Sequence, residues 1–473
     1  MQRLLIQDWS LGRVVRAMDG RMHGRSLGQG NPTGVATDTR SIALGELFVA
    51  LRGDRFDGHD FVDDAVSAGA CAVVVEDRSA VSSQRATVIV VDDCYQALAR
   101  LGHAVFCAAR QDGMHTIALT GSNGKTTTKE MLAALWSLRG DVWATPGNFN
   151  NHIGVPLTLC AIPANCDHLI VELGANHRGE ISKLIKMVPA EQRIITSIGR
   201  AHLEGFGSMA GVRKAKGEIF EGAERDTTAI VPWAEGEALL PYEFPGNFVT
   251  FGDEQDAQVR IASVSSRVES GSMAMAVTLE ARNRKWTLSL PLMGRHNASN
   301  LAAAMATFFS AGIEIDGDAI NGALADLELP GGRLRIESVG SLKVMDDAYN
   351  ANPSSMRASF RAFEEWSAND GAETRLAVIG DMHELGEAAE LSHRELAAWL
   401  TDRRCLSALA FVGEFGPSMT RVARNGGINE VIATTDLDEV AQWLNEHEHA
   451  RVFIKGSRAN RLERIVDKLK SQS

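Results

Sequence analysis

The sequence has few cysteines and no long apolar run, and both features narrow the class of protein. Its six cysteines are scattered along 473 residues without a C-x-x-C pair, so we expect reduced thiols in a cytoplasmic protein and no disulfide framework. The first residues are interrupted by Asp8 and Arg13 and lack the apolar core of a signal peptide. The most apolar helical stretch, 300–312, is too short and too rich in alanine to cross a bilayer. We therefore predict a soluble chain without membrane insertion.

The sequence also has no excess of basic over acidic residues. Lysine and arginine number 48 against 60 aspartates and glutamates, which gives a net charge of −12. This balance provides no electrostatic footprint for nucleic acid or anionic lipid. We expect small-molecule substrates and no nucleic acid, and we take the chain to act as a monomer.

Length and pattern together predict an α/β protein of three domains. At roughly 150 residues per domain, the chain has room for about three. Short apolar strands alternate with helical stretches, as in parallel βαβ units, whereas residues 258–292 alternate like antiparallel strands. Breaker residues at 329–332 mark a boundary. The predicted domains are residues 1–91, 92–329 and 330–473.

The stretch TGSNGKTTTKEML, residues 120–132, has the context of a phosphate-binding loop. A β-rich run precedes it and a helical stripe of apolar residues follows it. In this arrangement glycines permit close backbone approach, and the helix N-terminus faces the anion. The spacing G-x-x-G-K-T is shorter than the usual G-x-x-x-x-G-K-[ST]. We predict a nucleoside triphosphate site formed by Gly121, Ser122, Asn123, Gly124, Lys125, Thr126 and Thr127.

Two polar residues follow the strands that come after this loop. Glu172 ends the apolar run LIVE, where P-loop enzymes often place an acidic ligand of Mg²⁺, and His202 lies just beyond the next strand. A lone histidine is more often structural than a metal ligand. Two such positions at consecutive strand ends nevertheless favour a metal site. Lys216, 14 residues after His202, is expected on a helix that returns toward this site.

Eight motifs, in order along the chain, resemble those of the Mur ligases. They are TGSNGKTTTKE, NFNNHIGVPLTL, ELGANHRGEI, AHLEGFGSMAGVRKAKGEIF, GRHNASNLAAAMA, DDAYNANPSSM, GDMHELG and IKGSR. The resemblance covers essentially the whole chain, and the shortened phosphate loop is similar to that family's own form. It implies an N-terminal domain for a UDP-sugar peptide, a central ATPase domain with a parallel sheet, and a C-terminal Rossmann-like domain for the amino substrate.

The resemblance also implies an ATP-dependent, ADP-forming amide ligase. The terminal carboxylate of a UDP-N-acetylmuramoyl-tripeptide would take the γ-phosphoryl group of ATP, and the amine of D-alanyl-D-alanine would attack the resulting acyl phosphate. The product would be the pentapeptide precursor of peptidoglycan. The implied cofactors are ATP and two Mg²⁺, because cations must offset the repulsion between carboxylate and triphosphate.

The family's phosphate and metal residues match positions in this chain. Lys125 would contact the β- and γ-phosphates, and Thr126, Glu172 and His202 would bind Mg²⁺. The resemblance further implies that CO₂ adds to Lys216, which gives a carbamate whose oxygens coordinate magnesium. The alternative is an ammonium that touches phosphate directly. Burial would favour the neutral amine that the addition requires.

A second group of matched residues would complete the nucleotide cleft. Arg333 resembles a phosphate-contacting arginine, but the extra Gly332 leaves Arg335 as an alternative. Without the resemblance, Asn297 would be interpreted as a cap, Arg333 as a surface charge and Asp347 as part of a turn. The remaining matches are Asn297 near adenine, Asp347 on the ribose, and Tyr349 and Asn350 in the same cleft.

The N-terminal block contains a region that resembles the family's UDP site. Thr39 and Arg40, with Asp57, Gly58 and His59, are the expected contacts. The alternative for DGHD is a turn that caps the next helix.

The acceptor and donor peptides should meet polar residues near the phosphate loop. D-alanyl-D-alanine carries a carboxylate, and Lys455, Ser457 and Arg458 follow the strand RVFI at an end that faces the interdomain cleft. The alternative is a plain loop into the last helix. Asn148 and Asn151, from NFNN, are also predicted substrate contacts.

Three other functions compete with this interpretation. The ligase that adds the third amino acid is disfavoured, because the acidic-residue-Asn-Pro-Arg motif for a diamino acid is absent and YNANP is present. Folylpolyglutamate synthase shares the chemistry, but the stretch LFVALRG with DGHDF argues against it. A P-loop switch or binding module would turn over ATP without an amide product.

Overall fold

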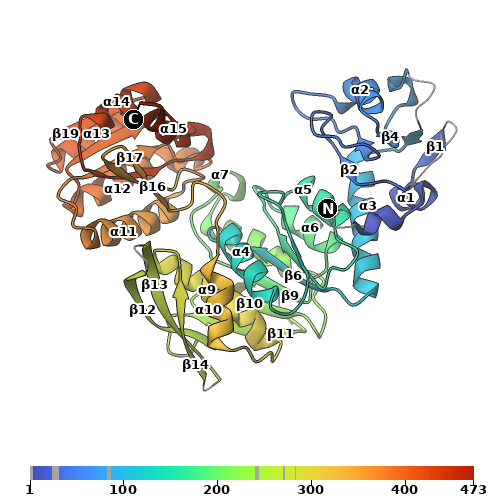
Figure 1. The fold of residues 1–473 in the computed structure, drawn as a ribbon, viewed down its shortest axis with the longest axis horizontal. Helices are drawn as coiled ribbons and strands as arrows, with labels where there is room; N and C mark the ends of the chain where they lie inside the picture. The colour runs from blue at the N-terminus through green and yellow to red at the C-terminus, as the bar shows by residue number, and fades with distance from the viewer. Residues whose placement is uncertain are drawn as a thin grey trace.

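The computed structural model describes residues 4–23, 31–82, 87–239, 244–269, 272–282 and 284–472, which form three α/β domains. Each domain is built around its own sheet, and the N- and C-terminal domains lie on opposite sides of the central one (Figure 1). The predicted fold class is therefore confirmed. Within the described ranges, no helix is both long and apolar enough to span a bilayer.

The N-terminal domain contains a five-stranded sheet. Its elements are η1 (Leu5–Asp8), α1 (Leu11–Met18), β1 (Arg21–His23), β2 (Val35–Ala36), β3 (Leu47–Val49), η2 (Gly58–Phe61), α2 (Val62–Ser67), β4 (Ala72–Val75), η3 (Arg78–Ala80) and β5 (Val88–Val90). The strand order is β1-β5-β4-β3-β2, with β1 antiparallel to β5 and the other neighbours parallel. Strands β3 and β4 are buried throughout, as expected for parallel strands covered on both faces.

The central domain contains a nine-stranded sheet. Its elements are α3 (Cys94–Gln111), β6 (His115–Thr120), α4 (Lys125–Trp136), β7 (Val142–Ala144), α5 (Gly154–Cys160), β8 (His168–Glu172), α6 (Glu180–Met187), β9 (Gln192–Ile195), α7 (Leu203–Phe206), α8 (Met209–Gly217), η4 (Glu218–Phe220), β10 (Thr228–Pro232), η5 (Gly236–Leu239), β11 (Asn247–Gly252), β12 (Val259–Glu269), β13 (Ser272–Ala281), β14 (Arg284–Leu290), α9 (Arg295–Ser310) and α10 (Gly317–Ala325). The strand order is β14-β13-β12-β11-β10-β9-β6-β8-β7. Strands β12, β13 and β14 pair antiparallel, as the sequence predicts, and the other pairs are parallel.

Both faces of the central sheet are buried by helices. Along β6, Ile117 and Leu119 belong to one apolar cluster together with residues of α4 and α9, whereas Ala118 belongs to another with residues of α3, α5 and α6. Alternate residues of a strand point to opposite faces, so each strand joins two cores. Ligands can therefore reach this sheet only at the strand ends, and β6 lies between β8 and β9 there.

The C-terminal domain contains a six-stranded sheet. Its elements are β15 (Arg335–Val339), β16 (Leu342–Asp346), α11 (Pro353–Asn369), β17 (Arg375–Gly380), η6 (Gly386–Ala388), α12 (Ala389–Asp402), β18 (Ala408–Val412), α13 (Gly416–Asn425), β19 (Glu430–Thr434), α14 (Leu437–Asn445), β20 (Arg451–Lys455), η7 (Arg458–Asn460) and α15 (Glu463–Gln472). The order is β15-β16-β20-β17-β18-β19, with only β15 and β16 antiparallel among these pairs. The mostly parallel sheet agrees with the expected Rossmann-like domain.

Candidate active site

The phosphate-loop motif connects the carboxyl end of β6 to the first turn of α4. Both of its glycines are required by close packing, since a Cβ on Gly121 would lie 2.0 Å from Thr196 Oγ1 and one on Gly124 would lie 2.2 Å from Asn300 Oδ1. Gly124 also has a left-handed φ of 82°, which a residue with a Cβ rarely adopts. The loop thus places the first N–H groups of α4 at the open edge of the sheet, where they can face an anion.

Lys125 is the first residue of α4 and lines a cavity beside this loop. Its Nζ donates to the carbonyl oxygen of Gly121 at 2.9 Å. Burial lowers the pKa of this amine, and the nearby Glu172 carboxylate acts in the opposite direction. The amine therefore lies over the phosphate loop, where it can meet phosphate oxygens.

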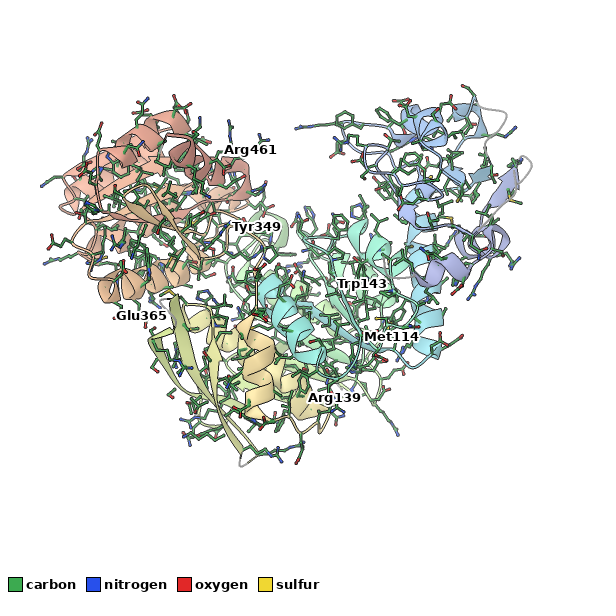
Figure 2. All side chains as sticks on the ribbon, viewed as in Figure 1. Met114, Arg139, Trp143, Tyr349, Glu365 and Arg461 are labelled. Atoms are coloured by element: carbon green, nitrogen blue, oxygen red, sulfur yellow. The ribbon has the colours of Figure 1, made fainter. Side chains whose placement is uncertain are left out.

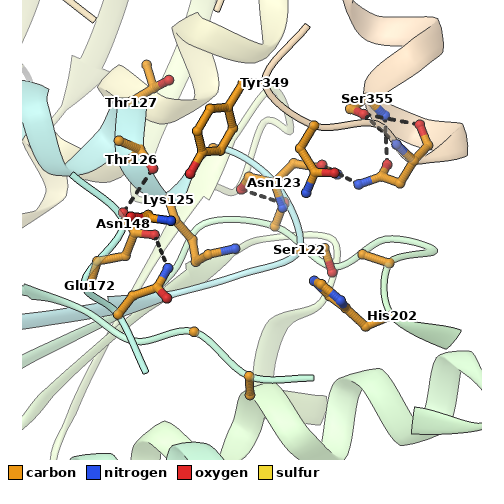
Figure 3. A pocket seen from close by; sticks show the side chains of 18 of the residues that line it. Ser122, Asn123, Lys125, Thr126, Thr127, Asn148, Glu172, His202, Tyr349 and Ser355 are labelled. Atoms are coloured by element: carbon orange, nitrogen blue, oxygen red, sulfur yellow. Dashed lines mark hydrogen bonds between the residues drawn. The ribbon is translucent and has the colours of Figure 1, made fainter. Parts of the chain in front are cut away.

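Glu172 and Thr126 lie side by side at the end of β8 (Figure 3). Thr126 Oγ1 donates to Glu172 Oε2 at 3.0 Å, and Asn150 Nδ2 donates to Glu172 Oε1 at 2.7 Å. The N–H of Glu172 donates to Thr145 Oγ1 at 2.9 Å. The glutamate is only 1% exposed, and the bonds from Thr126 and Asn150 satisfy its buried carboxylate. The structure thus brings together Thr126 and Glu172, two of the predicted metal ligands.

His202 lines the same cavity, but its ring is turned toward the C-terminal domain. Its Nδ1 lies 2.5 Å from Glu384 Oε2. Figure 3 shows His202 well apart from Glu172. The residue has a left-handed φ of 52° at the N-cap of α7. Glu172 and His202 are therefore at one edge of the sheet without being adjacent.

Lys216 projects from α8 into the protein interior. It is 1% exposed, and its Nζ lies 5.4 Å from the centroid of the Phe206 ring. Within the described ranges, this Nζ has no hydrogen-bond or ion-pair partner. Burial, followed by the nearby Lys125, lowers the pKa of Lys216 to about 7. Lys214, two residues earlier on the same helix, is exposed.

A cavity of about 1020 Å³ lies between the central and C-terminal domains. Figure 2 shows Tyr349 where these two domains meet. Gly121 and Lys216 are not on its wall. Most residues predicted for ATP and metal line it, as do Tyr349 and Asn350, which were predicted in the same cleft. The ATP and metal residues on the wall are Ser122, Asn123, Gly124, Lys125, Thr126, Thr127, Glu172, His202, Asn297, Arg333 and Asp347.

Arg333, and not Arg335, reaches the phosphate loop. Arg333 Nη2 donates to Thr126 Oγ1 at 3.2 Å, and its Cζ lies 3.7 Å from the centroid of the Tyr349 ring. Arg335 is exposed on β15 and does not line this cavity. The extra Gly332 is accommodated by its left-handed φ of 74°. The geometry therefore favours Arg333 between the two alternatives.

The other nucleotide-cleft residues are held in polar networks. Lys455 is 3% exposed, and its Nζ lies 2.5 Å from Asp347 Oδ2 and 2.9 Å from the carbonyl oxygen of Asn350. Asn297 Nδ2 donates to the carbonyl oxygen of Met293 at 2.7 Å. These bonds orient the side chains before any ligand is bound. Lys455 is therefore the ion-pair partner of Asp347.

The rest of the KGSR motif does not reach the cavity wall. Ser457 Oγ accepts from the N–H of His383 at 2.9 Å, which ties two loops of the C-terminal domain together. Arg458 has a side chain that is 66% exposed and lies 2.8 Å from Glu463 Oε1. Of the three residues predicted to bind the dipeptide, the structure brings only Lys455 to the cavity.

The residues predicted for the UDP part lie in the N-terminal domain and not on the cavity wall. Thr39 is half-buried. Arg40 has a side chain that is 88% exposed and forms an ion pair with Asp38 at 2.6 Å. An exposed guanidinium with one carboxylate partner remains open to phosphate.

The DGHD motif forms the predicted cap. Asp57 Oδ1 accepts the N–H of His59 at 2.9 Å at the start of η2. His59 Nε2 in turn accepts the N–H of Glu76 at 3.0 Å. A Cβ on Gly58 would lie 2.7 Å from Leu51 N. The motif therefore has a structural role of its own, which leaves a UDP contact as a prediction.

The loop that carries NFNN includes side chains that the sequence analysis missed. Asn148 and Asn151 both line the cavity, and Asn151 Oδ1 caps α5 by accepting the N–H of Gly154 at 2.9 Å. Asn150, which we did not predict, holds Glu172. Lys129, also missed, is 1% exposed and donates to the carbonyl oxygen of Thr145 at 2.6 Å. Its place one turn after the phosphate loop was a signal that we did not use.

The sequence analysis also missed side chains by which the C-terminal domain reaches the phosphate loop. Asn352 and Ser354 contact Asn123, and Glu384 contacts His202. Asn352 and Ser354 belong to the motif DDAYNANPSSM and Glu384 belongs to GDMHELG. Each also follows β16 or β17 at the carboxyl edge of a parallel sheet, but neither signal specifies the partner.

Together these features define a P-loop nucleotide-binding enzyme whose site is shared by two α/β domains. Three family models match the chain: the catalytic domain of the Mur ligase family over residues 31–105, the Mur ligase middle domain over 119–308, and the glutamate ligase domain of Mur ligases over 332–458. The chain belongs to the Mur ligase family, whose members are ATP-dependent, ADP-forming ligases.

Individual relatives match over nearly the whole chain. The chain is 33% identical over 465 residues to the UDP-N-acetylmuramoyl-tripeptide–D-alanyl-D-alanine ligase of Escherichia coli, covering 97% of each. It is similar to a crystal structure of MurF from Acinetobacter baumannii, with a TM-score of 0.86, 29% identity, and coverage of 98% and 99% of the two chains. It is also similar to the MurF ligase of Thermotoga maritima in complex with ADP, with a TM-score of 0.77, 27% identity, and coverage of 93% and 97%.

Proposed function

We propose that this protein is an ATP-dependent ligase that joins D-alanyl-D-alanine to a UDP-N-acetylmuramoyl-tripeptide, with release of ADP and phosphate. The observation that supports this proposal most strongly is a single cavity lined by residues of two domains. These residues are Lys125, Thr126 and Glu172 of the central domain and Arg333 and Asp347 of the C-terminal domain. The name of the Escherichia coli relative supports the choice of substrates. The product is the UDP-linked pentapeptide from which peptidoglycan is made.

The first step transfers the γ-phosphoryl group of ATP to the terminal carboxylate of the tripeptide. Two anions must approach each other, so cations that face them lower the barrier. Lys125 lies over the phosphate loop, and Arg333 approaches Thr126 from the other domain. Lys125 then contacts the β- and γ-phosphates, and Arg333 contacts the transferred group. The tripeptide carboxylate gains the phosphate leaving group that an amine can displace.

The residues present fit Mg²⁺. Thr126 Oγ1 and Glu172 Oε2 lie 3.0 Å apart, and Mg²⁺ prefers a carboxylate or two together with hydroxyl, water and phosphate oxygens. Bound there, the metal supplies neutralisation of the phosphate charge. For His202 to act as a further ligand, its ring must leave the neighbouring Glu384 carboxylate and turn toward the metal.

Lys216 fits the proposed carbamate better than a free ammonium. The residue is 1% exposed and its Nζ has no hydrogen-bond or ion-pair partner within the described ranges, and an unpaired ammonium on a buried side chain is costly. A pKa of about 7 leaves a large share of the amine neutral at neutral pH. The neutral amine attacks CO₂, a proton is released, and the resulting carbamate provides two oxygens that share one negative charge near the metal site.

The cavity supports a path for the tripeptide from the N-terminal domain. Its wall includes Tyr95 and Gln96 at the start of α3, and Tyr95 Oη donates to the carbonyl oxygen of Arg52 in the N-terminal domain at 2.6 Å. We assign residues 1–91 to the UDP-sugar part, through Thr39, Arg40, Asp57, Gly58 and His59. Residues 92–329 bind ATP, with Asn148 and Asn151 near the peptide. Residues 330–473 bind the dipeptide, with Lys455, Ser457 and Arg458 as the proposed contacts of its carboxylate, of which Lys455 lies on the cavity wall.

An isotope experiment tests the acyl phosphate directly. The tripeptide carboxylate is labelled with ¹⁸O and the reaction is run to completion with ATP, Mg²⁺ and D-alanyl-D-alanine. The mechanism predicts one ¹⁸O in the released phosphate, because the carboxylate oxygen that is phosphorylated leaves with phosphorus. Unlabelled phosphate alongside amide product would refute this route.

A further inference from the structure

The C-terminal domain is hydrogen-bonded to two side chains of the phosphate loop, Thr126 and Asn123, and Asn123 makes two of these bonds. Asn123 Oδ1 accepts from Asn352 Nδ2 at 2.7 Å, and Asn123 Nδ2 donates to Ser354 Oγ at 2.9 Å. The two partners are 229 and 231 residues away in sequence, at the start of α11. Both polar atoms of one loop amide are therefore used by the other domain.

On the central side, the backbone of Asn123 is fixed by the end of β9. Its carbonyl oxygen accepts from Thr196 Oγ1 at 2.6 Å and from Ser197 Oγ at 3.0 Å, and its N–H donates to Ser197 Oγ at 2.9 Å. A Cβ on Gly199 would lie 2.9 Å from Ser354 Oγ and 3.5 Å from Asn123 Nδ2. At Gly199 the two domains thus meet in direct contact, where a methyl group would fit only if Ser354 Oγ shifted.

On the C-terminal side, Asn352 is fixed by the helix that it caps. It is 8% exposed, and its Oδ1 accepts the N–H groups of Ser354 and Ser355 at 3.2 and 2.9 Å. Ser355 Oγ accepts the N–H of Asn352 at 3.0 Å, which completes a capping box. One side chain thus caps α11 with its oxygen and reaches the phosphate loop with its nitrogen. Any shift of α11 moves the partner of Asn123.

The other contacts between these domains at the site involve groups that the proposed function assigns to metal binding. Arg333 contacts Thr126, and Glu384 contacts His202. The proposed function needs the Thr126 hydroxyl and the His202 ring for metal, so both contacts must change on ligand binding. The contacts of Asn352 and Ser354 use neither group. They can persist through the reaction while the others exchange.

We infer that Asn123, Asn352 and Ser354 form an interdomain clamp that sets the position of the C-terminal domain on the phosphate loop. The inference rests on the proposed function, in which residues of both domains act on one nucleotide. Asn352 and Ser354 are positioning residues, since they act through Asn123 and through the placement of Asp347 and Arg333. Loss of the clamp loosens the loop and lowers turnover, while each domain stays folded.

The test compares Asn352→Ser with two further variants. Serine caps a helix about as well as asparagine, but its short side chain lacks the Nδ2 donor that reaches Asn123. Ser354→Ala removes the other half of the clamp and leaves the Asn352 side chain in place. The matched control is Asp436→Ser, because Asp436 caps α14 of the same domain by accepting the N–H of Asp438 at 2.8 Å and does not line the cavity.

Amide hydrogen exchange of the full chain without nucleotide is the primary measurement, and melting temperature and kcat accompany it. We expect faster exchange in residues 121–128 for Asn352→Ser and Ser354→Ala, although the substitutions are in another domain. The melting temperature should stay near that of the wild type. Where the ligase reaction is observed, kcat should fall on the order of tenfold, because the free energy of one or two hydrogen bonds corresponds to a rate factor of that size. Asp436→Ser should change neither exchange in the loop nor kcat.

Unchanged exchange in residues 121–128 for both clamp variants would overturn the inference. If Asn352→Ser does not fold, Ser354→Ala decides alone, because the cap of α11 is intact in it. The exchange measurement needs no turnover. A failure of the clamp is therefore separable from a failure of the proposed ligase activity, which would remove kcat for the wild type as well.

Discussion

Replacing Lys125 by methionine removes one charge from the phosphate site and changes little else. Its Nζ donates to a single backbone oxygen, that of Gly121, and burial lowers the pKa of the amine. The folded state therefore gains nothing from the charge, and the melting temperature should not fall. In the reaction, loss of one such electrostatic contact typically costs a factor on the order of 10² to 10³ in kcat, or about 3 to 4 kcal/mol.

The assay for Lys125→Met is ADP release in the presence of both substrates, with thermal unfolding measured on the same preparation. Lys214→Met is the matched control, because Lys214 is an exposed lysine of the same domain, and it should retain wild-type turnover. A folded Lys125→Met variant that turns over within about threefold of the wild type would refute the phosphate role, since the expected loss is far larger.

Three further predictions concern single side chains. Lys216→Ala should be nearly inactive and its activity partly restored by acetate, while Lys214→Ala stays active. If acetate restores no activity and removal of bicarbonate does not change the activity of the wild type, the carbamate proposal is wrong. Arg458→Ala should raise KM for D-alanyl-D-alanine more than KM for ATP in steady-state kinetics, and equal rises would place the dipeptide elsewhere. Burial, and then the neighbouring His168, lower the pKa of His115 from 6.5 to about 4. The unfolded chain therefore binds the proton first as pH falls, so stability present above pH 6.5 should be lost toward pH 4, by at most about 3 kcal/mol. Urea unfolding at several pH values should show this loss in the wild type and a smaller one in His115→Phe; equal losses in both would assign it to other groups.

The sequence predicted those parts of the fold that leave a one-dimensional pattern. Strand β4 is buried along its length and β8 is buried after its first residue, so Ala72–Val75 and Leu169–Val171 appear as apolar runs. Strand β1 is exposed along its three residues and pairs with β5 across 65 residues of chain or more, so no local pattern marks it. The boundaries at 91 and 329 remain predictions.

The site was predictable where one motif or one strand end determines a residue's place. The phosphate loop and Glu172 follow from strand, turn and helix order. Asn150 and Asn352 were not predictable in this way, because each meets its partner through tertiary packing. The choice of Arg333 over Arg335 was not predictable in this way either, because it depends on how Gly332 turns the chain.

The most direct test of the account is a product assay with purified protein. ATP, Mg²⁺, D-alanyl-D-alanine and a UDP-N-acetylmuramoyl-tripeptide are combined, the products are identified by mass, and each component is omitted in turn. The account predicts a UDP-N-acetylmuramoyl-pentapeptide in equal amount with ADP, and none of it when any component is left out. Hydrolysis of ATP at the same rate without an amide product would contradict it.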